Sequence, residues 1–224
     1  MTRTLILVPT PSEREVLGPL LEPVLRADDR LELCGFGLVA AASVTTQLIA
    51  NQRPQRVILA GIAGTYSATL PVGSATAFDD VACYGIGAGS GGEHQTTGDM
   101  GWNHVGGRIS EANVDGKIVA DRIALCGTGS SGGTSQSRQL LSVATASGDS
   151  EDAALRRRRF PQALAEDMEG FAVAMACRLA DVPVTIIRGI SNQAGDRNLA
   201  NWQIDAALKA AADLVKKTGV VAGQ

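Results

Sequence analysis

The chain has 224 residues, a length that fits one compact α/β domain with a sizeable buried core. Charged residues make up 19% of it and the formal net charge is −3, so no basic excess is present to attract a nucleic-acid backbone. Aromatic residues are 4% of the chain, too few for a platform that stacks several exposed bases. The composition therefore favours one small molecule in one pocket over a nucleic-acid partner.

The first apolar run is short. It reaches Pro9 and charged residues within a few positions, which predicts neither a signal peptide nor a membrane span. The cysteines are dozens of residues apart and form no CxxC pair: Cys34, Cys83, Cys126 and Cys177. Three of them lie in apolar stretches, a pattern typical of reduced, buried thiols. We therefore expect a cytoplasmic protein with no membrane partner.

Short apolar runs alternate with helix-like stretches along the chain. Strands are predicted at 5–8, 30–36, 56–60, 74–84, 122–126, 140–145 and 184–189. Helical periodicity predicts helices at 39–50, 170–181 and 202–217. Interleaved strands and helices favour a largely parallel, covered sheet, and paired β segments around 74–87 and 104–126 make it mixed. We expect an α/β fold in which residues 1–224 form a single domain, with a mixed central sheet flanked by helices.

Residues 85–107 stand apart as a glycine-rich run, GIGAGSGGEHQTTGDMGWNHVGG. The run is too rich in glycine to predict a regular element and too long for a simple connector, so we expect a mobile or functional loop. The two histidines, His94 and His104, lie in it. Without an HExxH motif, a Cys/His cluster or a histidine near a plausible nucleophile, neither a metal site nor a Ser-His-Asp hydrolase is expected.

A carboxylate follows the first predicted strand. In Thr10-Pro11-Ser12-Glu13, Thr10 suits the N-cap, Pro11 the first helical position and Glu13 the N3 partner of a capping box. The same Glu13 stands at the carboxyl end of a parallel strand, where open α/β sheets bind ligands. The sequence fits both interpretations of Glu13, a structural helix cap and a functional carboxylate.

Three glycine-rich segments have weak patterns. A GxGxxA sequence at 35–40 is similar to a dinucleotide fingerprint, but no acid follows the next strand to bind a ribose, so tight strand-to-helix packing is favoured. AGIAG at 60–64 suits either close approach to a ligand or a turn. GTGSSGG at 127–133 lacks the Gly-Lys-Ser/Thr ending of a phosphate loop. The four arginines at 156–159 are expected on a solvated helix face.

The last third of the chain contains two polar strand ends. EDMEG at 166–170 places three acids at a strand-to-helix junction, where the helix dipole alone would favour negative charge. RGISN at 188–192 ends another strand. Each pattern is modest evidence for a site when taken alone.

Together, these segments resemble the nucleoside phosphorylase/nucleosidase family. The resemblance rests on Glu13, the 35–41 turn, AGIAG, ASGD at 146–149, DMEG at 167–170 and RGISN, in matching order from about residue 4 to 215. It implies a nucleoside phosphorylase-like three-layer sandwich that hydrolyses a purine nucleoside, without a cofactor or metal, as a homo-oligomer. The segment ISNQAGDRNLANW at 190–202 resembles the futalosine hydrolases of menaquinone biosynthesis more than the methylthioadenosine nucleosidases.

The resemblance also implies roles for individual residues. Glu13 would activate the attacking water, Arg188 would orient Glu13 and that water, and Glu169 would accept hydrogen bonds from ribose hydroxyls. The remaining substrate contacts would come from Ala63, Gly64, Met168 and Ser191. Asn192 replaces the aspartate that protonates N7 in adenine-releasing relatives. An amide donates to the N7 and O6 acceptors of a 6-oxopurine, so Asn192 favours a hypoxanthine base.

The sequence departs from the family pattern in several places. Ile62 replaces a hydroxyl residue of the family. The aromatic residue that stacks on the base in adenine-releasing relatives is missing after 147–149, and Phe160 or Trp102 is a candidate to replace it. Arg197 and Trp202 resemble residues at the corresponding positions of futalosine hydrolases. The alternative interpretation is that Arg197 is a charge at a helix start and Trp202 an aromatic residue of the core. The alternatives are a methylthioadenosine/S-adenosylhomocysteine nucleosidase, a Rossmann-type NAD(P)-dependent reductase, and a silent nucleoside-binding protein in which Glu13 only caps a helix.

Overall fold

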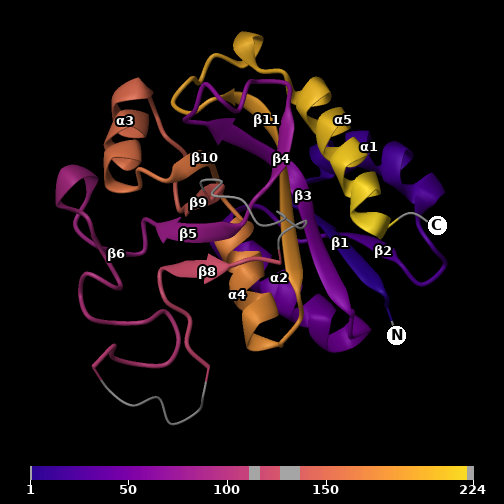
Figure 1. The fold of residues 1–224 in the computed structure, drawn as a ribbon, viewed down its shortest axis with the longest axis horizontal. Helices are drawn as coiled ribbons and strands as arrows, with labels where there is room; N and C mark the ends of the chain where they lie inside the picture. The colour runs from indigo at the N-terminus through magenta and orange to yellow at the C-terminus, as the bar shows by residue number, and fades with distance from the viewer. Residues whose placement is uncertain (1, 111–116, 127–136, 221–224) are drawn as a thin grey trace.

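The computed structural model describes residues 2–110, 117–126 and 137–220 (Figure 1). Its strands are β1 (Thr4–Val8), β2 (Arg30–Leu33), β3 (Arg56–Thr65), β4 (Ala75–Ala77), β5 (Asp80–Tyr84), β6 (Gly87–Ala88), β7 (Gln95–Thr96), β8 (Arg122–Ala124), β9 (Gln139–Val143), β10 (Ala163–Asp167) and β11 (Val184–Gln193). Its α-helices are α1 (Pro11–Leu21), α2 (Gly37–Gln52), α3 (Ser150–Arg159), α4 (Gly170–Leu179) and α5 (Ile204–Val215).

Nine of the described strands form one mixed sheet. Its order is β2-β1-β3-β10-β9-β5-β8, with β11 pairing with β3 and β4 pairing with β11. β2, β1, β3 and β11 run parallel, as do β10, β9 and β5. Antiparallel pairs join β10 to β3, β4 to β11 and β8 to β5. The predicted mixed α/β fold is confirmed.

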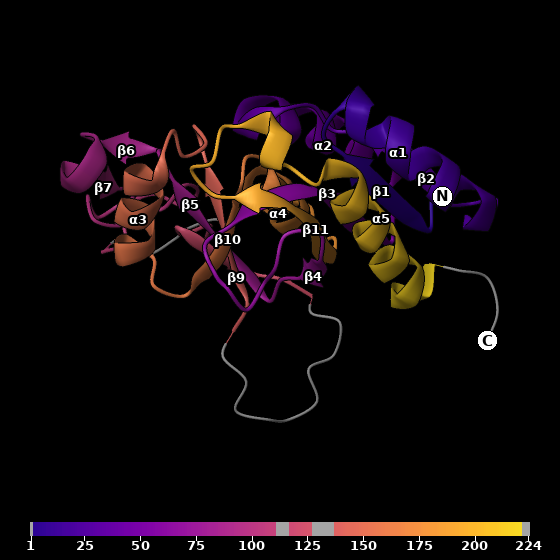
Figure 2. The same cartoon turned by 90° about the horizontal axis from the view of Figure 1, so that it is seen from above.

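Helices cover both faces of the sheet because the buried strands present apolar side chains on both sides (Figures 1 and 2). In β1, Leu5 and Leu7 pack in the core shared with α2 and α4. Ile6 and Val8 pack on the opposite face, in the core shared with α1 and α5. α3 lies at the end of the molecule away from β1 and β2, over a smaller third core (Figure 2). The result is three layers with the sheet in the middle.

Several element boundaries differ from the predictions. β3 and β11 run on to Thr65 and Gln193 because they pair with each other along almost their whole length. The segment predicted as one β-rich stretch at 74–84 is divided into β4 and β5, which pair with different strands. β10 was not predicted, since two of its five residues are acids. The segment 127–133 lies outside the described residues.

The glycine-rich stretch 85–107 contains regular structure, so the expectation of none was wrong. β6 and β7 pair as a short antiparallel ribbon. Gly87 has φ +153, and a Cβ on it would lie 1.9 Å from the carbonyl oxygen of Gln95, so the ribbon requires glycine there. The mobility of this stretch stays a prediction.

Tight packing explains the GxGxxA sequence. Gly35 has φ +89, and a Cβ on it would lie 2.9 Å from the Cβ of Ala40, in the first turns of α2.

Three cysteines are buried and Cys126 is exposed, and all four thiols are free. The longest helix of the described chain is α2, with 16 residues, and no helix there has the length and apolar character needed to cross a bilayer.

Candidate active site

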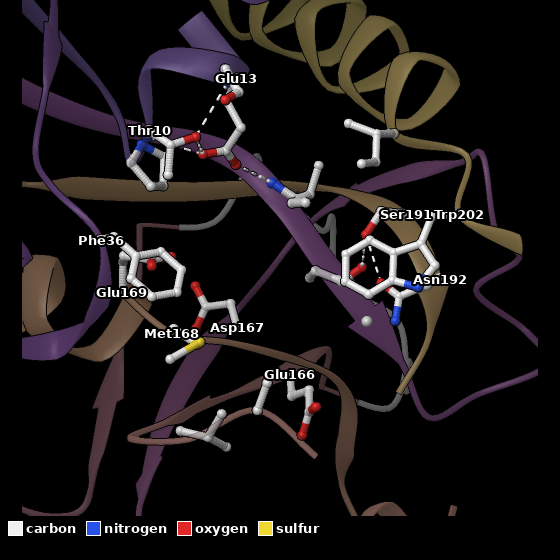
Figure 3. A pocket seen from close by; sticks show the side chains of 18 of the residues that line it. Thr10, Glu13, Phe36, Glu166, Asp167, Met168, Glu169, Ser191, Asn192 and Trp202 are labelled. Carbon is white, nitrogen blue, oxygen red and sulfur yellow. Dashed lines mark hydrogen bonds between the residues drawn. The ribbon is translucent and has the colours of Figure 1, made fainter. Parts of the chain in front are cut away.

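A cavity of about 250 Å³ opens at the carboxyl ends of β1, β3, β10 and β11 (Figure 3). β1 runs parallel to the first half of β3, and β10 runs antiparallel beside the last residues of β3, so the carboxyl ends of β1 and β10 approach each other along β3. β11 runs parallel to β3 on its other side and ends at the same place. Seven predicted site residues line the cavity: Glu13, Ala63, Gly64, Met168, Glu169, Ser191 and Asn192. Arg188, the eighth, is fully buried behind the carboxylates of the lining.

Glu13 combines the two roles that its sequence context left open. Thr10 Oγ1 accepts from the backbone N–H of Glu13, and Glu13 Oε2 accepts from the backbone N–H of Thr10 at 3.1 Å, so the capping box is confirmed. The other carboxylate oxygen, Oε1, accepts from the backbone N–H of Ile62 at 2.9 Å. The carboxylate lies in the cavity wall at 6% exposure. It is therefore held in place from both α1 and β3.

Arg188 is the buried counter-ion of the site. Its Nε and Nη2 donate to Asp167 Oδ2 at 2.9 and 2.5 Å, and Nη2 also donates to Glu169 Oε2 at 3.2 Å. Burial by itself lowers the pKa of Arg188, but Asp167, Glu169 and Glu13 outweigh it and raise the pKa above its usual range. The guanidinium is thus permanently charged and orients two carboxylates at once.

The remaining nitrogen of Arg188 lies near Glu13. A Cβ on Gly61 would lie 2.2 Å from Arg188 Nη1 and 2.7 Å from Glu13 Oε1, so only glycine fits between the two side chains. Nη1 is buried and has no hydrogen-bond partner among the described residues. The hydrogen bonds of Arg188 therefore go to Asp167 and Glu169, whereas the family resemblance implies Glu13 as its partner.

Glu169 receives a second donor from the start of α2. The backbone N–H of Gly37 donates to Glu169 Oε1 at 3.0 Å. Burial raises the pKa of Glu169 to about 7; Arg188 opposes this rise and Asp167 adds to it. Because the protein's own carboxylate occupies this helix N-terminus, the dinucleotide interpretation of residues 35–40 loses the amide that would bind a pyrophosphate.

Ser191 and Asn192 form the opposite wall, across the cavity from Met168 and Glu169 (Figure 3). Asn192 Oδ1 accepts from the hydroxyl of Ser191 at 2.7 Å, and Asn192 Nδ2 donates to the carbonyl oxygen of Gln193 at 2.7 Å. The contact from Nδ2 to the carbonyl oxygen of Asp196 is long, at 3.5 Å. Both donors of the Asn192 amide therefore face backbone carbonyl oxygens, and the one toward Asp196 is held only weakly.

Glu166 centres a buried polar cluster beside the same cavity. Its carboxylate accepts from the backbone N–H and the hydroxyl of Ser147, from the Tyr66 hydroxyl and from Arg156. Burial, then the charge of Glu166, raise the pKa of Tyr66, so the phenol keeps its proton. Arg156 is 5% exposed, so the prediction of a solvated face was wrong for it, while Arg157, Arg158 and Arg159 are exposed.

The aromatic residues of the lining are Phe36 and Trp202. The two aromatics expected to compensate lie elsewhere: Phe160 packs edge-on against Tyr84 with ring centroids 5.9 Å apart, and Trp102 lies under Arg108. No residue of the 85–107 stretch is in the described lining. Sequence reasoning assigned no separate role to Phe36, although this residue stands between the glycines of the 35–40 motif.

The carboxylates Glu166 and Asp167 were also missed as site residues. They were counted only among the acids of a helix start, because the strand that contains them was not predicted. Their position directly before Met168 and Glu169 was the available signal. Neighbouring residues of a strand face opposite sides, so Glu166 turns toward Arg156 and Asp167 toward Arg188. Both reach the cavity because β10 ends there, at Asp167.

The comparisons with known proteins agree with this architecture. The model of the phosphorylase superfamily matches residues 30–221. A futalosine hydrolase of Streptomyces coelicolor is 36% identical over 165 residues, covering 74% of this chain and 65% of that protein. A 5′-methylthioadenosine/S-adenosylhomocysteine nucleosidase of Geobacillus sp. is 31% identical over 198 residues, covering 84% of this chain and 79% of that protein.

A solved structure has the same fold. The 5′-methylthioadenosine/S-adenosylhomocysteine nucleosidase of Neisseria meningitidis, in complex with methylthio-immucillin-A, superposes with a TM-score of 0.70 at 21% identity, covering 97% of this chain and 98% of that chain. The match of a family model over most of the chain, the relatives above 30% identity and this shared fold point to one conclusion: the chain belongs to the phosphorylase superfamily.

Proposed function

We propose that the chain hydrolyses the N-glycosidic bond of a purine nucleoside, and that its substrate is futalosine, which is split into hypoxanthine and dehypoxanthinyl futalosine. The observation that carries the proposal is the convergence of Glu13, Glu169 and Asn192 on one cavity from the ends of three strands. Futalosine as substrate would place the chain in menaquinone biosynthesis. We also retain the family-based proposal of a homo-oligomer in the cytoplasm.

In this mechanism Glu13 acts as the general base. Water attacks the anomeric carbon as the bond to the purine nitrogen breaks, and the water proton passes to the Glu13 carboxylate. The bonding electron pair leaves with the base as its anion, which accepts a hydrogen bond from Asn192 and is then protonated by solvent to give hypoxanthine. The transition state has positive charge on the sugar, which the carboxylates of Glu13 and Glu169 stabilise. Glu169, held by Arg188 and the Gly37 amide, accepts hydrogen bonds from the ribose hydroxyls, and Met168 packs against the sugar.

The charge of the cavity favours hydrolysis over phosphorolysis. Its lining contains four carboxylic acids, Glu13, Glu166, Asp167 and Glu169. An inorganic phosphate beside Glu13 would be repelled by that carboxylate, whereas a neutral water would be oriented by it. We therefore expect base release that does not depend on added phosphate.

The test of the proposed function is a substrate panel. Purified protein is incubated with futalosine, inosine and 5′-methylthioadenosine, with and without inorganic phosphate, and the free bases are separated by chromatography. Hypoxanthine from futalosine at the highest kcat/KM supports the proposal. Faster release of adenine from 5′-methylthioadenosine would support the second candidate, the activity named for the Geobacillus relative. No free base from any nucleoside would contradict hydrolysis altogether.

Replacing Asn192 by Asp is expected to move the preference from 6-oxo to 6-amino purines. The new carboxyl would face the carbonyl oxygens of Gln193 and Asp196, which favour its protonated form, and that form can donate a proton to N7 of adenine. We expect the kcat/KM ratio of adenosine to inosine to rise about 10–100-fold, the effect of one charge-assisted hydrogen bond. An unchanged ratio would contradict the role of Asn192 in base selection.

The raised pKa of Glu169 predicts a pH dependence. Because the ribose contact requires the ionised carboxylate, kcat/KM is expected to fall about tenfold per pH unit below pH 7. In the Glu169→Gln variant this decrease is absent and kcat/KM is low throughout. Glu151→Gln, a change at an exposed acid of α3, should keep the wild-type profile. An inflection near pH 7 that survives in Glu169→Gln would assign it to another group.

The same pKa shift affects stability with a definite sign. Between its ordinary value of 4.5 and about 7, the folded state binds a proton on Glu169 that the unfolded chain has released. The contribution of this group to the free energy of unfolding therefore decreases as the pH rises through that interval. A pH series of urea denaturation on wild type and Glu169→Gln measures the difference.

A further inference from the structure

The cavity has one positively charged side chain in its described lining, Arg197. Every described carboxylate of the lining has protein donors of its own, including Arg188 for Asp167 and Glu169 and Arg156 for Glu166. Arg197 forms no ion pair or hydrogen bond with any described residue, unlike these two buried arginines. Its charge is therefore available to a ligand.

Trp202 positions this arginine. The Arg197 guanidinium lies 5.2 Å from the centroid of the Trp202 ring. The indole N–H donates to the carbonyl oxygen of Asp196 at 2.9 Å, which fixes the ring orientation. A guanidinium that contacts an aromatic ring keeps its N–H groups at its edge, where they can bind a carboxylate with two parallel hydrogen bonds.

The segment that contains Arg197 and Trp202 is hydrogen-bonded to strands β3 and β11, whose ends form the Ser191–Asn192 wall of the cavity. The backbone N–H of Ala194 donates to Thr65 at 2.9 Å, and that of Gln203 donates to Ser191 at 2.7 Å. The carbonyl oxygen of Asp196 is shared, since it accepts from Trp202 and is also contacted by the amide of Asn192. The position of Arg197 is thus coupled to the residue proposed to select the base.

We propose that Arg197 and Trp202 form the subsite for the 5′ substituent of the nucleoside, and that this substituent is an aromatic group bearing a carboxylate. The inference rests on the proposed function. With the base at Asn192 and the 2′ and 3′ hydroxyls at Glu169, the 5′ carbon is the remaining position from which a ribose can extend. Arg197 pairs with the carboxylate and Trp202 packs against the ring, while a neutral methylthio group would leave the arginine without a partner.

Arg197→Gln tests the charge without removing the side-chain bulk. With futalosine, kcat/KM is expected to fall about 10–100-fold, mainly through KM, because a charge-assisted hydrogen bond is lost. With inosine, which has no 5′ substituent beyond its hydroxyl, kcat/KM should stay within about twofold. Arg197→Lys should recover part of the loss, since lysine keeps the positive charge but cannot form the bidentate pair with a carboxylate. Arg157→Gln, at an exposed arginine outside the cavity, is the matched control.

Each outcome of this comparison is informative. A loss confined to futalosine supports the subsite, and a futalosine KM that rises with salt in wild type but not in Arg197→Gln supports it further. An equal loss with both substrates would show a structural role and overturn the inference, as would equal activities of Arg197→Gln and wild type. Inosine 5′-monophosphate is tested as a third substrate, and a loss confined to it, with futalosine unaffected, would assign Arg197 to a phosphate and overturn the inference. No cleavage by wild type would overturn the proposed function, and the inference with it.

Discussion

Glu13→Gln is expected to lower kcat by about a thousandfold with little change in KM, within the range found when a general base is removed. The amide keeps the size of the carboxylate but cannot take a proton from water at neutral pH. The hydrogen bonds that the Glu13 carboxylate accepts from Thr10 and Ile62 are structural, so the substitution also lowers the free energy of unfolding. Steady-state kinetics with futalosine or inosine measure the effect.

Two controls separate chemistry from structure in this variant. Disturbing the capping box should cost about 1 kcal/mol, which thermal unfolding detects without loss of the fold. Glu15→Gln, an exposed acid two residues further along α1, should leave kcat unchanged. Retention of more than a tenth of the wild-type kcat by folded Glu13→Gln would refute the assignment of Glu13 as the base.

Arg188→Met is expected to reduce the free energy of unfolding by about 5 kcal/mol at pH 7.5, at the upper end for breaking a buried ion pair. The substitution removes the only described cation that contacts both Asp167 and Glu169, and both are buried. The penalty arises from two carboxylates left without their counter-ion rather than from lost packing. Urea denaturation measures it.

The electrostatic origin of this loss makes further predictions. Adding Asp167→Asn to Arg188→Met should restore part of the stability, because one uncompensated charge disappears. Arg157→Met, at an exposed arginine, should change the free energy of unfolding by less than about 0.5 kcal/mol. A loss below about 1 kcal/mol in Arg188→Met would show that water, not the guanidinium, neutralises the pair.

Local sequence patterns were sufficient for most of the scaffold. Apolar runs predicted β1, β3 and β11, and the threonine, proline and glutamate at 10–13 predicted the start of α1 with its capping box. These features depend on contacts within a few residues, which the sequence contains directly. Strand β10 was missed because its acids are stabilised by partners distant in sequence, such as Arg156 and Arg188.

Residue patterns were enough to predict the fold class, the residue types at the strand ends and the family. The folded chain was needed to show that Arg156 is buried while its neighbours are exposed, and that Arg188 binds Asp167 and Glu169. It was also needed to show that the aromatic residues of the cavity lining are Phe36 and Trp202 rather than Phe160 and Trp102. The difference lies in the range of the interactions. Propensity and periodicity are local, whereas the burial of a charge and the identity of its partner depend on which strands lie side by side in the sheet.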